Sequence, residues 1–376
     1  MVMAGMLLCL KGWHVPLCNA EARALLPDYD FENISSRIVV TNSDISTAEL
    51  TSAVFCSSGI QFALKSPIIC QPNESLENIA DKLKQCFEEN RITGSIAIRP
   101  HKVGNKIAEF SSSAMTRQLG GIAVDHGLAI DLDNPQHELI LITDGSENLL
   151  IIGLLASEMN IKTGINERNA TKRPFFKPIS LDPKLARLCI NLACGQISEK
   201  AVLDPMCGTG GFAIEAIGMG RNCVALDMQE QMTTGTKENI EFLFDGTNCD
   251  YEILTGDATK LSAFVPKKWH QNIAGIVLDP PYGRNSHGTD NHEKLINQTL
   301  SSIKEIVDEN AKLVLILPII PSQNTTENAI ELLHGDWGEF KQMMQTSGWS
   351  VESYYKEHVH SSLSRLIVLA TGAPLN

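Results

Sequence analysis

The most informative segment of the sequence is Ile276-Val277-Leu278-Asp279-Pro280-Pro281-Tyr282. Its apolar run predicts a buried parallel strand that stops at a carboxylate. In open α/β sheets, ligands bind outside the carboxyl ends of the strands. Because proline donates no hydrogen bond and keeps the preceding residue extended, we expect the carbonyls of Asp279 and Pro280 to be free acceptors. With the Asp279 carboxylate and a stacking ring at Tyr282, this turn suits a planar NH2 group. The alternative is a proline-rich loop in which Asp279 only caps a helix.

Strands and helices alternate from residue 179 to the end of the chain. The expected strands are residues 201–203, 223–226, 252–254, 274–278 and 312–317. The expected helices are residues 180–195, 211–219, 229–244, 291–307 and 340–346. The chain then closes with a hairpin of residues 351–359 and 363–369. This pattern predicts a doubly wound, seven-stranded sheet with an antiparallel edge.

The first half of the chain is predicted to have an α+β fold. In residues 1–70 we expect strands at 6–10 and 37–40 and a helix over 20–26, which ends before a proline. In residues 71–158 a helix follows its cap Ser75, a strand covers 95–98, and Asp144-Gly145 joins a hairpin of strands 138–143 and 149–154. Residues 159–178 are predicted to form a basic linker. The apolar start of the chain lacks a basic segment and a cleavage pattern, so we expect a first strand there and not a signal peptide.

Acidic residues and glycines mark the ends of three further strands. Asp204-Pro205-Met206-Cys207-Gly208-Thr209-Gly210-Gly211 follows the first, Asp227 ends the second, and Gly256-Asp257-Ala258 ends the third. Glycines at a strand-to-helix turn let a ligand approach the backbone. An acid at the position of Asp227 suits ribose hydroxyls, and Asp257 suits an adenine amine. Because the turn has no basic residue for pyrophosphate, a dinucleotide is disfavoured. The alternative is a Rossmann-like fold whose acidic strand ends are unrelated.

Composition excludes several classes of protein. The net charge of −13 argues against bulk attraction to nucleic acid but allows a local basic face. No apolar run reaches the roughly 20 residues that a membrane helix needs. The ten cysteines form no Cys-x-x-Cys pair, and no His/Cys cluster has the spacing of metal ligands. We therefore expect no metal, reduced thiols and a cytoplasmic location.

The linker holds the densest basic cluster, which includes Arg168, Lys172 and Arg173 beside Phe175 and Phe176. Cations that alternate with aromatic rings are typical of a segment that contacts phosphates and stacks on bases. The alternative is a solvated linker that its phenylalanines anchor to a domain. Both descriptions can hold together.

The glycine turn and the acidic strand ends resemble a class I S-adenosylmethionine-dependent methyltransferase. More narrowly, the motifs Arg173–Pro183, Asp204–Gly210, Asp279–Arg284 and His358–Arg365 resemble the archaeal tRNA guanosine-10 N2-methyltransferase family. The layout of residues 71–158 is similar to a THUMP RNA-binding domain, and residues 1–70 to the ferredoxin-like domain that precedes it. Residues 179–376 are then the methyltransferase domain. Lys177 and Ser361 depart from the family pattern, which puts substrate positioning in doubt.

The resemblance implies S-adenosylmethionine as cofactor, tRNA as partner and transfer of a methyl group to guanine N2. It implies catalytic roles for Asp279, Pro280, Pro281 and Tyr282. It implies cofactor binding by Asp204, Cys207, Gly208, Gly210, Asp227, Met228, Asp257 and Ala258. For tRNA phosphates we expect Arg99, Lys102, Arg168, Lys172 and Arg173. We also expect a monomer; a zinc-protein activator, as in eukaryotic relatives, cannot be read from this sequence.

Three rival functions stay open. The nearest is N2-guanine methylation at another position of tRNA, or of rRNA. Turns of this type also serve adenine-N6 and glutamine-N5 methylation, but those enzymes need no RNA-binding first half. A rival of another class is a non-catalytic RNA-binding scaffold, against which the complete set of four aspartates argues.

Overall fold

Two compact units divide the chain in the computed structural model. Unit 1 comprises Met1–Phe55 and Gly59–Asn160, and unit 2 comprises Cys56–Ser58 and Ile161–Asn376. The structure describes residues 5–158, 164–178, 180–281, 289–322, 327 and 330–373. Each unit is described below by itself.

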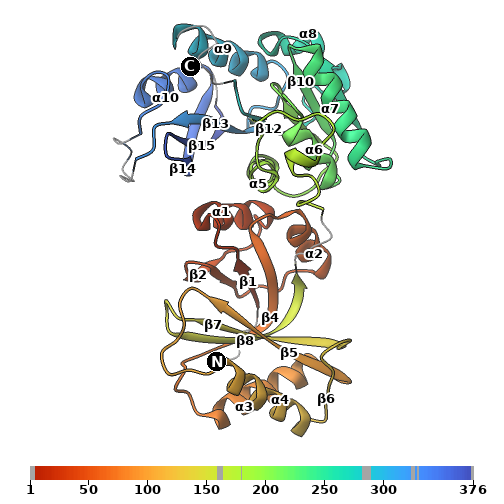
Figure 1. Ribbon diagram of the computed structural model, residues 1–376, viewed down its shortest axis with the longest axis vertical. Coiled ribbons are helices and arrows are strands. Elements are labelled where there is room, and N and C mark those ends of the chain that lie inside the picture. Colours follow the sequence, from red (N-terminus) through yellow and green to blue (C-terminus); the bar gives the residue numbers. More distant parts are fainter. Residues whose placement is uncertain are drawn as a thin grey trace. The chain divides into compact units, whose positions relative to one another are not determined.

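Unit 1 is built on one eight-stranded sheet with the order β2-β3-β1-β4-β8-β7-β5-β6 (Figure 1). Its strands are β1 (Met6–Leu10), β2 (Glu32–Ser35), β3 (Ile38–Thr41), β4 (Ile60–Cys70), β5 (Ser95–Val103), β6 (Ala129–Ile130), β7 (His137–Asp144) and β8 (Leu149–Glu158). Its helices are α1 (Val15–Leu25), α2 (Thr47–Cys56), α3 (Leu76–Glu89) and α4 (Ser112–Asp125). The α+β class expected for the first half is therefore confirmed.

Strand β4 joins the two segments that we expected at residues 1–70 and 71–158. It pairs antiparallel with β1 on one side and with β8 on the other. The elements from β1 to β4 have the order β-α-β-β-α-β, which is that of a split βαβ unit. One buried cluster includes side chains of both segments, among them Leu7, Phe62, Ile140 and Ile151. The two segments therefore share one sheet and one core.

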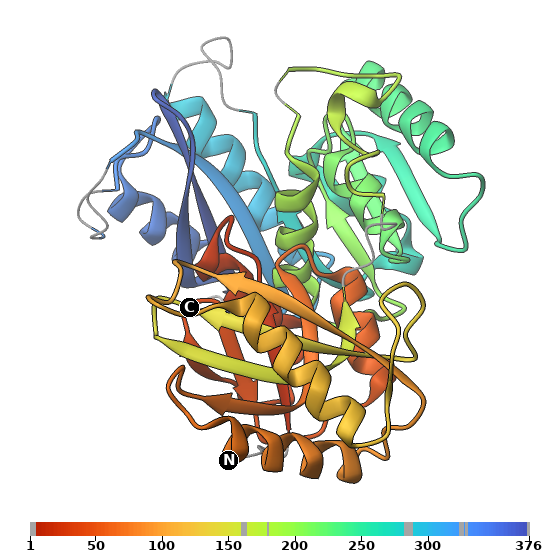
Figure 2. The same ribbon diagram turned by 60° about the horizontal axis from the view of Figure 1, so that its bottom comes forward.

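The helices of unit 1 show where local sequence signals succeed and where they fail. Ser75 caps α3 as expected, and its side chain accepts from the Asn78 N–H at 3.3 Å. Helix α1 begins at Val15, ahead of the expected start, because His14 caps it and a proline occupies its first turn. Helices α3 and α4 lie along the same face of the sheet, as two views show (Figures 1 and 2).

Unit 2 contains a seven-stranded sheet with the order β11-β10-β9-β12-β13-β15-β14. Its strands are β9 (Ala201–Asp204), β10 (Cys223–Asp227), β11 (Tyr251–Thr255), β12 (Ile273–Leu278), β13 (Lys312–Ile319), β14 (Trp349–His360) and β15 (Leu363–Gly372). The first five run parallel, whereas β15 runs antiparallel to both β13 and β14. The doubly wound sheet with an antiparallel edge is confirmed.

Helices cover both faces of this sheet. They are α5 (Pro183–Cys194), α6 (Gly211–Gly218), α7 (Glu230–Leu243), α8 (Leu261–Phe264), α9 (Thr289–Lys304) and α10 (Trp337–Thr346). Residues of α8, α9 and α10 pack in one core with alternate strand residues such as Leu203, Ile276 and Leu315. Helices α5, α6 and α7 contact the strands apart from that core. Asp182 caps α5, two residues after its expected start. Within the described residues, no helix combines the length and apolarity that a membrane crossing requires.

Candidate active site

Four carboxylates gather at one edge of the sheet in unit 2. Asp204 ends β9, Asp227 ends β10, Asp257 follows β11 and Asp279 follows β12. These four strands are neighbours in the sheet, and they run parallel. The chain winds from β9 outward to β11 and then crosses to β12, so β9 and β12 flank the point where the winding reverses. Ligands bind outside the carboxyl ends of the strands at such a point.

Asp204 is the most buried of the four, with 1% of its surface exposed. Its Oδ1 accepts from the Met206 N–H at 3.3 Å, and its Oδ2 has no hydrogen-bond partner among the described residues. Burial raises the pKa of Asp204 well above its usual range, and the charges of Asp227 and Asp279 raise it further. A cationic ligand group at Oδ2 would satisfy this carboxylate.

Asp227 bonds to the turns that follow β9 and β10. Its Oδ2 accepts from the Gly208 N–H at 3.0 Å, and its Oδ1 accepts from the Gln229 N–H at 2.9 Å. The carboxylate therefore fixes the glycine turn after β9 while it starts the turn after β10. Each oxygen keeps a lone pair for a ligand hydroxyl.

The two glycines expected under the cofactor have different surroundings. Gly208 has φ +53°, and nothing lies within 4 Å of the place where a Cβ would be. Gly210 has φ +82°, but a Cβ there would come within 2.6 Å of the Thr236 side chain on α7. Gly208 thus leaves its backbone open to a ligand, whereas Gly210 allows close packing between the turn and α7.

The other expected cofactor residues surround this turn. Cys207 is buried, and burial together with Asp204 and Asp227 raises the pKa of its thiol well above the usual range, so the thiol stays neutral. Asp257 caps a short 3-10 helix through Thr259, whose hydroxyl lowers the pKa of this carboxylate. Ala258 is buried, while Met228 is 67% exposed and offers an apolar surface beside Asp227.

The turn after β12 contains the expected catalytic residues. Asp279 is half-buried, Pro280 is buried and Pro281 is exposed. Tyr282 lies outside the described residues. His292 of α9, which the sequence did not single out, is buried against His334 at a ring distance of 5.3 Å. Burial and then His334 lower the pKa of His292, and a hydrogen bond to the Pro281 backbone opposes that shift.

Two of the expected phosphate-binding arginines are buried, which corrects their assignment. Arg168 and Arg173 are each 5% exposed. Arg168 donates to both carboxylate oxygens of Glu215 at 2.7 and 3.0 Å, and Arg187 of α5 donates to Oε2 at 3.0 Å. Arg173 donates to the Arg168 carbonyl at 2.8 Å. These guanidinium groups hold residues 164–178 against α6. A single glutamate in the otherwise apolar run of α6 is the sequence signal for this.

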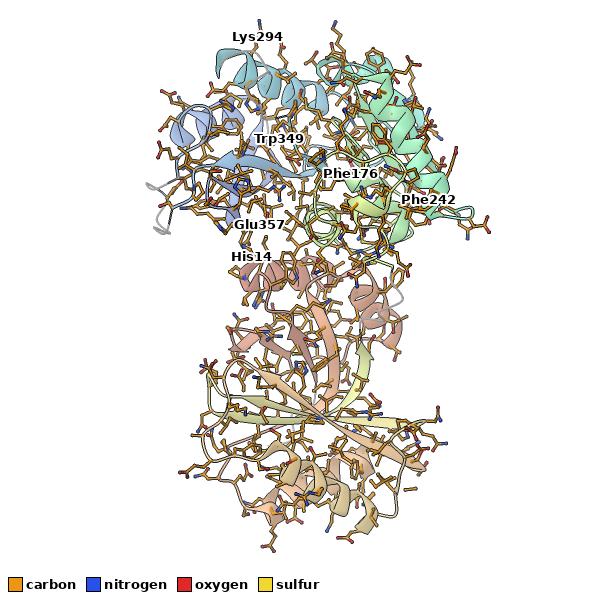
Figure 3. All side chains as sticks on the ribbon, in the orientation of Figure 1. His14, Phe176, Phe242, Lys294, Trp349 and Glu357 are labelled. Atoms are coloured by element: carbon orange, nitrogen blue, oxygen red, sulfur yellow. The ribbon has the colours of Figure 1, made fainter. Side chains whose placement is uncertain are left out.

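The other three basic candidates are accessible. Lys102 and Lys172 are exposed. Arg99 has 40% of its side chain exposed, and it pairs with Glu138 at 3.2 Å. One phenylalanine of this segment is packed and the other is exposed. Phe175 packs on Gly235 of α7. Phe176, which Figure 3 labels, is 44% exposed. Residues 164–178 are therefore part of unit 2, and not a solvated linker.

Polar residues of α7, which were not predicted from the sequence, also hold the site together. Thr236 and Asn239 are fully buried, and both bond to the glycine turn. The available signal was three polar residues, Thr233, Thr236 and Asn239, at a spacing that puts them on one face of the helix.

Comparison with known proteins places the chain among methyltransferases. Residues 170–351 match the RMKL-like methyltransferase domain. The chain is 30% identical over 298 residues to the tRNA (guanine(10)-N2)-dimethyltransferase of Pyrococcus abyssi. This match covers 79% of this chain and 80% of that protein. The enzyme of the same name from Methanothermobacter thermautotrophicus is 30% identical over 77% of both chains.

A third relative has a different named position. It is the tRNA (guanine(6)-N2)-methyltransferase of Methanocaldococcus jannaschii, which is 24% identical over 65% of this chain and 72% of its own length. The two position-10 enzymes are more similar in sequence, and their matches cover a larger share of this chain. The chain belongs to the family of the tRNA (guanine(10)-N2)-dimethyltransferases.

Proposed function

We propose that this protein transfers methyl groups from S-adenosylmethionine to the N2 amine of a guanosine in tRNA, at position 10. One observation carries the proposal. Four carboxylates lie at the carboxyl ends of four adjacent parallel strands. The last of them begins an Asp-Pro-Pro turn, and the turn after β9 has an open glycine backbone at Gly208. The relatives' names supply the substrate, and the arrangement of this chain suits the reaction.

The residues present fit S-adenosylmethionine. Asp204 has a buried oxygen without a partner among the described residues, which suits the ammonium group of the methionine moiety. Gly208 leaves open space where a side chain would stand, and Asp227 beside it suits the ribose hydroxyls. Met228 and Asp257 suit the adenine ring and its amine, and Cys207, Gly210 and Ala258 pack the turns behind them. When bound, this cofactor supplies an electrophilic methyl group on a positively charged sulfur.

The acceptor side of the mechanism depends on Asp279 and Pro280. The lone pair of guanine N2 is delocalised into the ring, so this amine is a poor nucleophile. The Asp279 carboxylate and the Pro280 carbonyl would accept hydrogen bonds from its two N–H groups. These bonds would direct the lone pair toward the methyl carbon. The transfer would break the bond between the methyl carbon and the cofactor's sulfur as the N–C bond forms, and Asp279 would take the surplus N2 proton. Holding the reactants in line supplies about 7–11 kcal/mol at best. Pro281 fixes the turn, and Tyr282 stacks on the flipped guanine.

Unit 1 serves to bind the tRNA in this proposal. Residues 1–70 act as the ferredoxin-like part and residues 71–158 as the THUMP part, with Arg99 and Lys102 on β5 and Lys172 in unit 2 as phosphate contacts. The protein works as a monomer in the cytoplasm.

Methyl transfer from labelled S-adenosylmethionine to unmodified tRNA transcripts, followed by nucleoside analysis, tests the function. We expect N2-methylguanosine and its dimethyl form at position 10, and no label in a transcript whose guanosine 10 is replaced by adenosine. Label only at position 6 would favour the activity named for the Methanocaldococcus relative. A protein that binds the cofactor but labels no tRNA would overturn the proposed substrate.

A further inference from the structure

Helix α7 presents buried polar groups where a helix normally presents an apolar stripe. Thr233, Thr236 and Asn239 are at most 2% exposed and lie on one face of the helix. A polar group removed from water destabilises the fold unless a hydrogen bond replaces the lost hydration. The partners of these side chains therefore indicate what the face is for.

Asn239 joins two segments that are distant in sequence. Its Nδ2 donates to the Phe175 carbonyl at 2.9 Å and to the Thr209 carbonyl at 3.1 Å, and its Oδ1 accepts from the Phe175 N–H at 2.9 Å. Phe175 belongs to the entry segment, which we define as residues 173–178. Thr209 belongs to the glycine turn of residues 207–210. One side chain amide thus fixes both.

Independent contacts hold the same two segments in place. Thr236 Oγ1 donates to the Gly208 carbonyl at 3.1 Å. The Ser180 hydroxyl donates to the Lys177 carbonyl at 2.8 Å and lies 2.9 Å from the Thr209 hydroxyl. Phe175 packs closely against α7, since a Cβ on Gly235 would come within 2.1 Å of its ring. The entry segment, the glycine turn and α7 therefore form one hydrogen-bonded assembly.

This assembly contacts Gly208, which is the residue of the glycine turn with an open backbone. Gly208 faces open space on one side, while its carbonyl bonds to Thr236 and its N–H bonds to Asp227. Helix α7 therefore fixes the orientation of the Gly208 peptide group, which we expect to face the ligand. A loss of the Asn239 donors would remove the bonds to the Thr209 and Phe175 carbonyls together.

We propose that Asn239 is a positioning residue that sets the affinity of the cofactor site by fixing the entry segment to the glycine turn. The inference rests on the proposed function, because it takes the ligand of this turn to be S-adenosylmethionine. It assigns no catalytic contact to Asn239. Its effect is confined to binding, and the chemistry at Asp279 stays unchanged.

The test compares Asn239→Asp with wild type by calorimetric titration of S-adenosylhomocysteine. Aspartate keeps the shape and the acceptor for the Phe175 N–H, but it replaces both donors with an oxygen that faces the Phe175 and Thr209 carbonyls. We expect Kd to rise about tenfold or more, as the loss of two buried hydrogen bonds predicts. In tRNA methylation, KM for S-adenosylmethionine should rise likewise, while kcat and KM for tRNA stay within about threefold of wild type.

Two further variants keep the test decisive. Thr236→Val removes only the bond to the Gly208 carbonyl and should raise Kd in the same direction, even if Asn239→Asp does not fold. Glu241→Gln, on the exposed side of the same helix, should leave Kd unchanged. A folded Asn239→Asp protein with wild-type Kd would overturn the inference, as would a change in KM for tRNA alone. A wild-type protein that binds S-adenosylhomocysteine but does not methylate tRNA would overturn only the substrate.

Discussion

Single residues decide the chemistry, and Asp279 is the first of them. If its carboxylate accepts a proton of the target amine, Asp279→Asn should lower kcat by about 100-fold or more. The Kd for S-adenosylhomocysteine should change little, because the proposal assigns the Asp279 carboxylate to the acceptor amine and not to the cofactor. Single-turnover methylation and calorimetry measure the two quantities separately. Normal turnover in the variant would remove Asp279 from the mechanism.

Asp204 predicts a pH dependence of cofactor binding. Burial holds its pKa above the usual range, so in the free protein this carboxyl keeps its proton to higher pH than an ordinary aspartate. The stability that it contributes is present at low pH and is lost as the pH rises through the raised pKa. A bound ammonium group favours the ionised form, so binding should release a proton and tighten as the pH rises.

Calorimetry in two buffers of different ionisation enthalpy measures this proton release. We expect the observed heat of S-adenosylhomocysteine binding to differ between the buffers for wild type. It should be the same in both for Asp204→Asn, which binds more weakly. Equal heats for wild type would show that Asp204 is already ionised in the free protein.

At the scale of elements, one buried charge fixes helix α6. Glu215 is fully buried between Arg168 and Arg187. Breaking a buried ion pair by removing one partner costs about 3–5 kcal/mol, because the other charges stay buried. We therefore expect Glu215→Gln to lower the free energy of unfolding by that amount, measured by urea denaturation. The exposed pair of Lys200 and Asp308 is the control, and Lys200→Ala should cost less than about 1 kcal/mol.

The sequence predicted elements well where a local signal specifies them. Ser75 and the spacing of Ile79 and Leu83 located α3, and continuous apolar runs located the parallel strands. It failed where the partner is distant in sequence. Arg168 was expected to bind phosphate because Glu215 comes close to it only after folding. Asn239 was not singled out, because its partners Phe175 and Thr209 are distant in sequence. The four strand-end aspartates were predictable because parallel strands bring their carboxyl ends to one edge.

At the scale of the whole molecule, a net charge of −13 must be reconciled with a polyanionic substrate. The accessible basic candidates are Arg99, Lys102 and Lys172, after Arg168 and Arg173 are excluded. We expect tRNA affinity to fall steeply between about 50 and 200 mM salt. Lys102→Ala and Lys172→Ala should each reduce the slope of log K against log salt by about 1.

Fluorescence anisotropy with labelled tRNA measures these slopes. Lys200→Ala, which removes a cation already paired with Asp308, is the matched control and should leave the slope unchanged. A flat salt response of the wild type would contradict phosphate binding by this set. Unchanged slopes in both lysine variants would place the contacts elsewhere on the chain.

The position of β4 in the sheet has a consequence for synthesis on the ribosome. One edge of this strand can pair with β1 soon after both emerge, but its other partner, β8, is made only after residues 71–148. Until then the nascent chain carries an open strand edge, which is a template for pairing with other chains. The late closure of such a non-local pair slows folding. Unit 1 is therefore the part of the molecule whose yield should depend most on translation speed and on chaperones that cover a growing sheet.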